Sequence, residues 1–168
     1  MLDINHQLKL AFLIAGAIVL HIVESILPTS LLFPGARLGL ANIITLFTLV
    51  NYGFKDALEV LLLRIVLSSL LVGTFFTTTF FLSLIGGILS LVIMAVAYYL
   101  LQIEFSIIGI SILGAAFHNL GQVLMAYFLI ENWRILFYLP YLLLASLPTG
   151  IFIGIIVIKL EKYLGFDI

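Results

Sequence analysis

Long apolar runs constrain this chain more than any other feature. Residues 8–27, 75–101 and 107–130 are each long and apolar enough to cross a bilayer, which takes roughly 20 residues. Hydrophobic residues make up 64% of the 168 residues and charged residues only 9%, which excludes a soluble globular domain. Backbone polar groups must be hydrogen-bonded inside hydrocarbon, and the runs far exceed strand length, so helices are predicted.

The runs predict an all-α integral membrane protein, built as one six-transmembrane-helix bundle over residues 1–168. The loop 28–37 contains two prolines and a glycine and is not expected to be helical. Gly86-Gly87 predicts a weak point in the fourth helix, and Pro148 predicts a kink in the sixth. The expected helices cover about residues 8–27, 38–52, 56–72, 75–101, 107–130 and 135–163.

Basic residues indicate the orientation of the bundle. Six spans place both termini on one side, which then carries four lysines, whereas the other side carries two arginines. Because cytoplasmic loops are enriched in lysine and arginine, both termini are predicted to be cytoplasmic in a multi-pass protein of the bacterial inner or plasma membrane. The lysines are Lys9, Lys55, Lys159 and Lys162, and the arginines are Arg37 and Arg134.

Two charged residues, Glu24 and Arg64, interrupt apolar sequence at membrane depth. A charge there costs about 2.5–3.5 kcal/mol on an insertion scale, so it normally faces a protein interior or a wet cavity and marks a ligand path. In the predicted topology most polar residues lie in the outer half of the bundle. We therefore expect one pocket, open to the outside and set among the first, third, fifth and sixth helices, that binds a solute through His21, Glu24, Arg37, Asn42, Arg64, His118, Asn119 and Gln122.

Structural roles for the same residues remain open from the sequence. Glu24 and Arg64 could form an ion pair that locks the first helix to the third. His118 and Gln122 lie four residues apart on one helical face, where they could contact a ligand or form an interhelical hydrogen bond. Asn119 points elsewhere and could serve only to hold helices together.

Several function classes lack their signatures. Paired aspartates that would hold magnesium against a pyrophosphate are missing, because Asp3, Asp56 and Asp167 are isolated. There is no Walker loop and no cysteine, and a net charge of -1 without a basic run indicates no nucleic-acid partner. The expectation is a protein that is not an enzyme and has neither a metal site nor a cofactor. A haem held by His21 and His118 has no other support.

Four segments carry a resemblance that covers nearly the whole chain. They are Pro34 to Asn42 (PGARLGLAN), Gly53 to Ala57 with Leu63-Arg64, Leu84 to Ser90 (LIGGILS), and Gly114 to Gln122 (GAAFHNLGQ). The chain resembles the Gx transporter family, which is also labelled heptaprenyl diphosphate synthase component I. That family looks like the substrate-binding (S) components of energy-coupling factor (ECF) transporters, which are six-helix membrane proteins that bind a vitamin-like solute from outside.

The resemblance implies partners and a docking surface. S components dock on a transmembrane coupling protein that carries two ATPase subunits, through small residues on the first helix, and Ala11 and Ala15 match that pattern. The arginines and His118 favour an anionic or carbonyl-rich ligand, and 14 phenylalanines favour an aromatic, quinone or isoprenoid body. The alternative function is a non-transport membrane subunit of a quinone- or flavin-handling complex.

Overall fold

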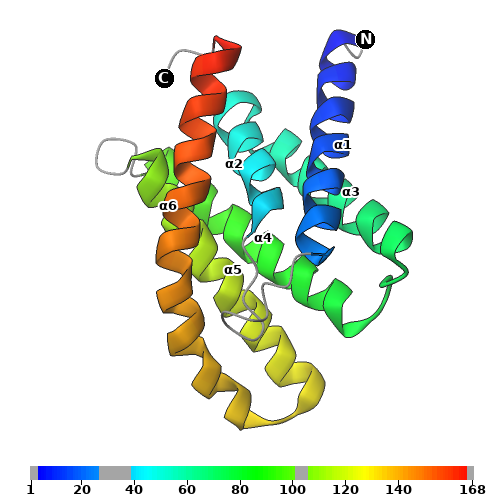
Figure 1. Cartoon of the computed structure of the whole chain (residues 1–168), viewed down its shortest axis with the longest axis vertical. Coiled ribbons are helices and arrows are strands. Elements are labelled where there is room, and N and C mark those ends of the chain that lie inside the picture. Colours follow the sequence, from blue (N-terminus) through cyan, green and yellow to red (C-terminus); the bar gives the residue numbers. More distant parts are fainter. Residues whose placement is uncertain (1–3, 27–38, 101–105, 166–168) are drawn as a thin grey trace.

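The chain folds as a bundle of helices, seen in Figure 1. The computed structural model describes residues 4–26, 39–100 and 106–165, which contain six α-helices, one 3-10 helix and no strand. The expected all-helical class is therefore confirmed. The elements are α1 (Ile4–Ile26), α2 (Leu40–Tyr52), α3 (Phe54–Val72), α4 (Thr78–Leu100), α5 (Ile107–Ile130), η2 (Trp133–Tyr138) and α6 (Leu139–Leu164).

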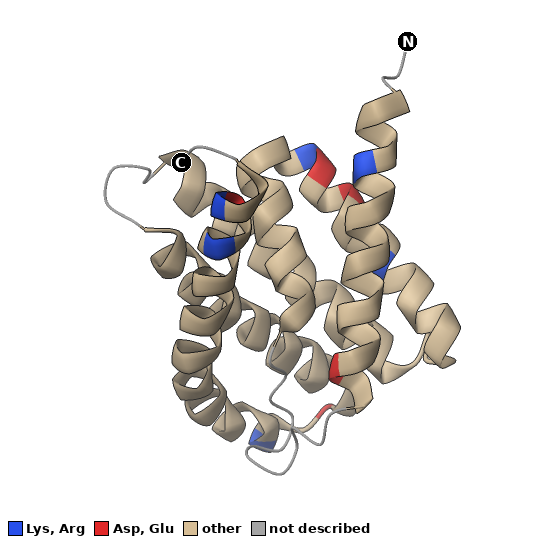
Figure 2. Ribbon diagram, turned by 45° about the horizontal axis from the view of Figure 1, so that its top comes forward, with Lys and Arg blue, Asp and Glu red and all other residues tan. Residues whose placement is uncertain are grey.

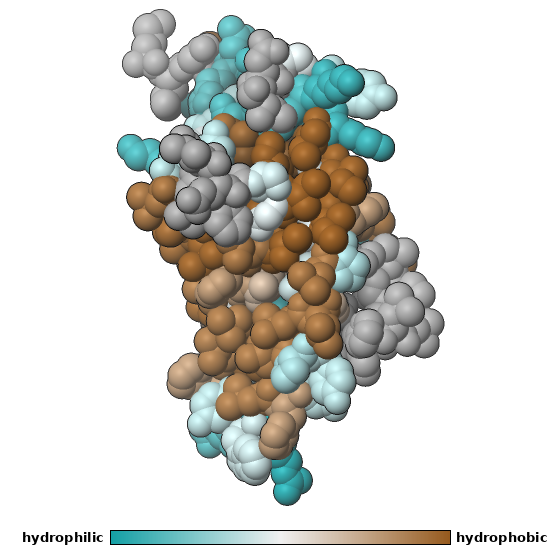
Figure 3. Space-filling view, turned by 90° about the vertical axis from the view of Figure 1, so that its left-hand side faces the viewer, coloured by the Kyte–Doolittle hydropathy of each residue, from teal (hydrophilic) through white to brown (hydrophobic). Residues whose placement is uncertain are grey.

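Within the described ranges, four segments are long and apolar enough to cross a membrane: α1, α4, α5, and η2 with α6. On the face drawn in Figure 3, hydrophobic side chains form a broad band between more polar ends. These features indicate a multi-pass membrane protein. The two other helices differ for separate reasons. α3 carries four charged residues (Lys55, Asp56, Glu59 and Arg64), and the 13 residues of α2 extend only about 20 Å.

α2 occupies the inside of the bundle, whereas α1 lies at its edge. Eight of the 13 residues of α2 are buried, and this helix packs against α1, α3, α4 and α6. Only Leu10, Ala17 and Glu24 are buried among the 23 residues of α1, which packs on α2 and α3. A helix surrounded by other helices need not itself span the hydrocarbon, because its backbone is shielded by protein.

Several of the approximate helix bounds expected from the sequence differ from the structure; α1, for example, begins at Ile4 and not near residue 8. The fourth helix begins at Thr78 and not at residue 75, because α3 ends at Gly73 in a left-handed conformation and residues 74–77 form a turn in which Phe76 also has a positive φ of 57°. The last segment begins as the 3-10 helix η2, whose N-cap Asn132 accepts a hydrogen bond from the Arg134 N–H. α6 follows from Leu139, with Pro140 in its first turn, where a missing N–H costs nothing.

Gly86 and Gly87, predicted to be a weak point, are packing positions within a continuous helix. α4 continues unbroken from Thr78 to Leu100, and Gly86 faces α5 while Gly87 faces α3. A Cβ at Gly86 would lie 2.8 Å from the His118 carbonyl oxygen. α6 likewise remains α-helical through Pro148, and its glycines meet α5. Small residues let membrane helices approach closely, which explains both contacts.

Both termini lie at one end of the bundle, and the connection from α5 to η2 lies at the other (Figures 1 and 2). Charged residues gather toward the terminal end in Figure 2. There the described structure contains an ion-pair contact of 3.2 Å between His6 of α1 and Asp56 of α3.

Candidate functional site

Five helices meet around a small polar cavity. α1, α3, α4 and α5 each contribute polar side chains, and the start of α2 completes the wall. The volume open to a water-sized sphere is only about 10 Å³, at the lower limit for one water molecule. The lining residues are His21, Glu24, Gly39, Asn42, Arg64, Ser83 and His118.

Glu24 joins α1 to the beginning of α2. Its Oε1 accepts a hydrogen bond from the backbone N–H of Gly39, which precedes the first residue of α2. Gly39 has a φ of +70°, a conformation that favours glycine, and the turn it makes brings its N–H to the carboxylate. The N-terminus of a helix carries a partial positive charge, so an acidic group at this place is electrostatically favourable.

Arg64 brings a permanent positive charge into the same cavity. It lies midway along α3, only 4% exposed, and Glu24 is only 7% exposed. Both charged groups line one small space, with His21 three residues before Glu24 on the same face of α1. One carboxylate, one guanidinium and two imidazoles together provide hydrogen-bond donors and acceptors for a polar solute.

His118 faces the cavity from α5, and Gln122 supports it from one turn further along. The Gln122 Nε2 and His118 Nε2 atoms lie 3.1 Å apart, in hydrogen-bond contact within the same helix. Both side chains are buried, but Gln122 does not line the cavity. Gly86 of α4 makes room for this pair, because a Cβ there would lie 2.9 Å from the Gln122 Cγ.

Asn119 has a different role from its neighbour His118. Its Nδ2 donates a 2.8 Å hydrogen bond to the backbone carbonyl of Leu142 on α6, and it does not line the cavity. The contact ties α5 to the first turns of α6. The sequence left two roles open for Asn119, ligand contact and a hydrogen bond between helices. In the structure Asn119 forms a hydrogen bond between helices.

The set of helices around the cavity differs from the expected one. α2 and α4 contribute through Asn42 and Ser83, whereas α6, expected to take part, lines none of it. Arg37 and the rest of the 28–37 loop lie outside the described residues. Ser83 was missed by the sequence reasoning, although a signal was present: Ser83, Gly87 and Ser90 place small residues at helical spacing within an otherwise apolar run.

The cavity gathers polar groups of several kinds. Within residues 4–26, 39–100 and 106–165, no group of three or more His, Cys, Asp or Glu residues could hold a metal ion. The site combines one acid, one guanidinium, two imidazoles, a serine and an asparagine at the junction of five helices. Such convergent polar groups in an apolar surrounding are typical of a ligand site.

The outer face of α1 carries the small residues noted in the sequence. Ala11 and Ala15 are both exposed, and a Cβ added at the adjacent Gly16 would meet no atom within 4 Å. No helix of the described bundle covers this face, and the bulky residues beside it, Phe12 and Val19, are also exposed. A second helix could therefore approach α1 closely here.

Comparison with known proteins identifies a family. The family model described as Heptaprenyl diphosphate synthase component I matches residues 13–160, which include every residue that lines the cavity. No curated protein and no solved structure showed significant similarity to the chain. The match confirms the resemblance seen in the sequence motifs.

Proposed function

Since this chain belongs to the heptaprenyl diphosphate synthase component I family, we propose that it is the substrate-binding S component of an ECF-type importer. It captures a vitamin-like or quinone- or isoprenoid-related molecule from outside the cell. The observation that carries the proposal is the polar cavity with Glu24 and Arg64 inside an otherwise apolar bundle. Buried charges of this kind are costly in a membrane and are normally kept for binding or transport.

The size of the cavity implies that it enlarges to accept a solute. A space of about 10 Å³ holds at most one water molecule, whereas sites for small organic ligands occupy about 300–1,000 Å³. α1 is the helix best placed to move, because few of its residues are buried and its main packing among the described residues is against α2 and α3. In this proposal the solute enters between α1 and the rest of the bundle, beside Glu24.

The partners in this proposal are a transmembrane coupling protein and two ATPase subunits. The chain would dock through the exposed Ala11 and Ala15 on α1. The same helix would then form both the docking face and one wall of the cavity. Movement of α1 on docking would reach Glu24 and His21 directly.

Binding is tested by identifying what co-purifies with the chain. Mass spectrometry of small molecules extracted from the purified protein should find one at near-stoichiometric amount. Arg64→Ala should lose it, and Arg64→Lys should lose most of it, because lysine cannot reproduce the planar fork of a guanidinium. Full retention of the molecule by both variants would show that Arg64 does not bind it.

Docking is tested by enlarging the small residues on α1. Ala11→Trp and Ala15→Trp should block co-purification of the coupling module while leaving solute binding by the isolated chain intact, because a bulky side chain keeps a second helix away. Leu144→Trp is the matched control, since Leu144 is 66% exposed on α6. Normal assembly with both alanine variants would refute docking through this face.

An apolar groove on the bundle supports a second candidate function. A wholly apolar groove of about 440 Å³ lies between α4 and α5, lined by residues such as Ile88, Leu124 and Phe128. Together with the family description, this groove favours a membrane subunit that holds a quinone or isoprenoid tail without transporting it. Co-purification of a coloured redox cofactor, and of no ATPase, would favour this alternative.

A further inference from the structure

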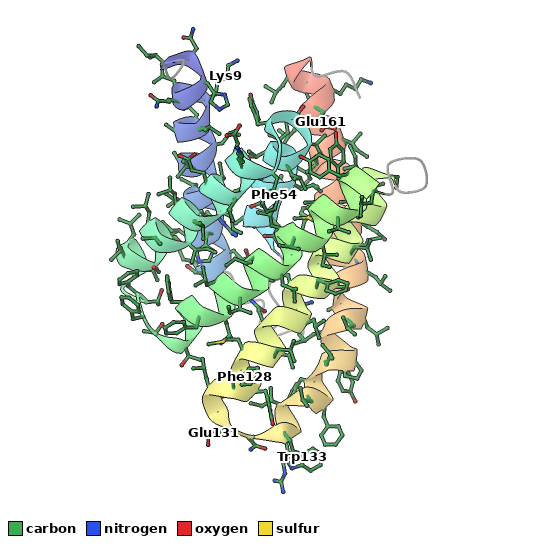
Figure 4. All side chains as sticks on the ribbon, turned by 180° about the vertical axis from the view of Figure 1, so that it is seen from behind. Lys9, Phe54, Phe128, Glu131, Trp133 and Glu161 are labelled. Atoms are coloured by element: carbon green, nitrogen blue, oxygen red, sulfur yellow. The ribbon has the colours of Figure 1, made fainter. Side chains whose placement is uncertain are left out.

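One more ionisable side chain is buried, and it lies outside the cavity. Glu161, in the penultimate turn of α6, is 0% exposed. Figure 4 places it at the end of the bundle that holds Lys9 and Phe54, opposite Glu131 and Trp133. Its sequence neighbours Lys159 and Lys162 are exposed, so the sequence alone suggests a solvent-facing helix end. The structure instead turns this carboxyl toward α2.

One neutral donor contacts the carboxyl. The Asn51 Nδ2 donates to Glu161 Oε1 at 3.1 Å and to its own helix at the Phe47 carbonyl at 2.9 Å. The Phe47 carbonyl can only accept, so it fixes the orientation of the Asn51 amide. Glu161 Oε2 is buried without a hydrogen-bond partner among the described residues. The two oxygens of this carboxyl group thus receive one hydrogen bond, from the Asn51 amide.

Among the described residues, no basic side chain pairs with Glu161 to balance the charge of a carboxylate. Within the described residues Glu161 has no ion-pair contact. α2 ends here, and the C-terminus of a helix carries a partial negative charge that disfavours a neighbouring anion. The titratable groups near this end of α2 include three tyrosines. Tyr52 of α2 has its ring against His6 of α1, Tyr98 of α4 has its hydroxyl 3.5 Å from the Val50 carbonyl, and the Tyr99 hydroxyl would lie 3.6 Å from a Cβ on Gly53. α5 has no titratable residue before His118, and η2 lies at the other end of the bundle.

We propose that Glu161 is a proton-binding site whose bound proton holds α6 against α2. A buried carboxylate with one neutral donor and no cation is strongly unfavourable, whereas the neutral acid needs no counter-ion. Release of the proton would leave a charge between the two helices, which favours their separation. The proposal does not depend on the transport function.

α2 connects the Glu161 site with the polar cavity. α2 carries Asn42 and the turn at Gly39 at the cavity, and Asn51 at Glu161 near its other end. α6 does not line the cavity, but it packs beside Gly39, since a Cβ there would lie 3.4 Å from the Ile153 Cδ1. A shift of α2 against α6 would therefore move Asn42 and Gly39 in the wall of the polar cavity.

Infrared spectroscopy of the full chain in lipid nanodiscs tests for the proton directly. At neutral pH the wild-type spectrum should contain a carboxylic-acid C=O band that Glu161→Gln loses. Glu59→Gln, which removes an exposed acid of α3, is the matched control and should keep the band. Glutamine has the shape and neutrality of the protonated acid, so this variant is the one best suited to fold.

Thermal unfolding across pH tests the consequence. The folded chain holds a proton that the unfolded chain releases, so stability should fall as pH rises, and Glu161→Gln should lose that part of the decline. Asn51→Ala should shift the decline to higher pH, because it removes the one donor that favours the charged form. An unchanged C=O band in Glu161→Gln, or a pH dependence of wild type shared by Glu161→Gln, would overturn the proposal.

Discussion

At the scale of single residues, His118 and Asn119 are adjacent in sequence but serve different parts of the molecule. Successive residues of a helix point about 100° apart, so one side chain reaches the cavity and the other reaches the Leu142 carbonyl of α6. His118→Ala should therefore reduce the amount of co-purified solute. Asn119→Ala should leave it unchanged and lower the free energy of unfolding by about 0.6–1.7 kcal/mol, the range for hydrogen bonds between membrane helices.

The two variants control each other, because they alter neighbouring positions of α5. Solute retention is measured by mass spectrometry and stability by thermal unfolding in the same detergent. The proposed division of roles would be wrong if Asn119→Ala lost the solute while His118→Ala retained it.

At the scale of helices, glycines determine how closely α4, α5 and α6 pack. A Cβ on Gly150 of α6 would lie 2.5 Å from the Ile112 Cα of α5, a backbone atom that cannot rotate away. Gly150→Ala should therefore force α6 away from α5 and destabilise the fold by about 1–3 kcal/mol, the usual cost of overpacking. Thermal unfolding measures the loss.

Gly16→Ala is the matched control on α1, where an added Cβ meets no atom within 4 Å. Alanine is the better helix former by about 0.8–1.0 kcal/mol, so this variant should be neutral or more stable. Equal stability of Gly150→Ala and wild type would mean that the α5–α6 contact is looser than the structure shows.

At the scale of the whole molecule, the chain has two ends with different chemistry. Both termini lie at one end (Figure 1), where Glu161 also lies, and Glu131, at the turn from α5 to η2, lies at the other (Figure 4). We propose that the terminal end is cytoplasmic. The natural chain has no cysteine, so single cysteines report accessibility without background.

In intact cells, Glu131→Cys should react with a membrane-impermeant maleimide, and Lys162→Cys should react only after the membrane is opened. Both positions are exposed in the structure, so burial does not limit labelling. The reverse pattern would invert the orientation, and the cavity would then have to be reached from the cytoplasm.

Much of the architecture could be predicted from the sequence because it follows from local composition. The apolar runs predicted helices, and the bounds of α5, residues 107–130, agree with the structure at both ends. His21, Glu24, Asn42, Arg64 and His118 were predicted to share a pocket because polar groups in hydrocarbon gather together, and the structure brings them to one cavity.

The sequence does not show which faces of the helices pack against each other. Ser83 lines the cavity, whereas Asn119 and α6 do not. These outcomes depend on how whole helices are rotated and how they cross. Glu161 is the clearest case: between two lysines it has the pattern of an exposed helix end, and only its packing on α2 makes it a buried acid. Hydrophobic pattern determines that a helix forms and crosses the membrane, whereas burial is a property of neighbours that are distant in sequence.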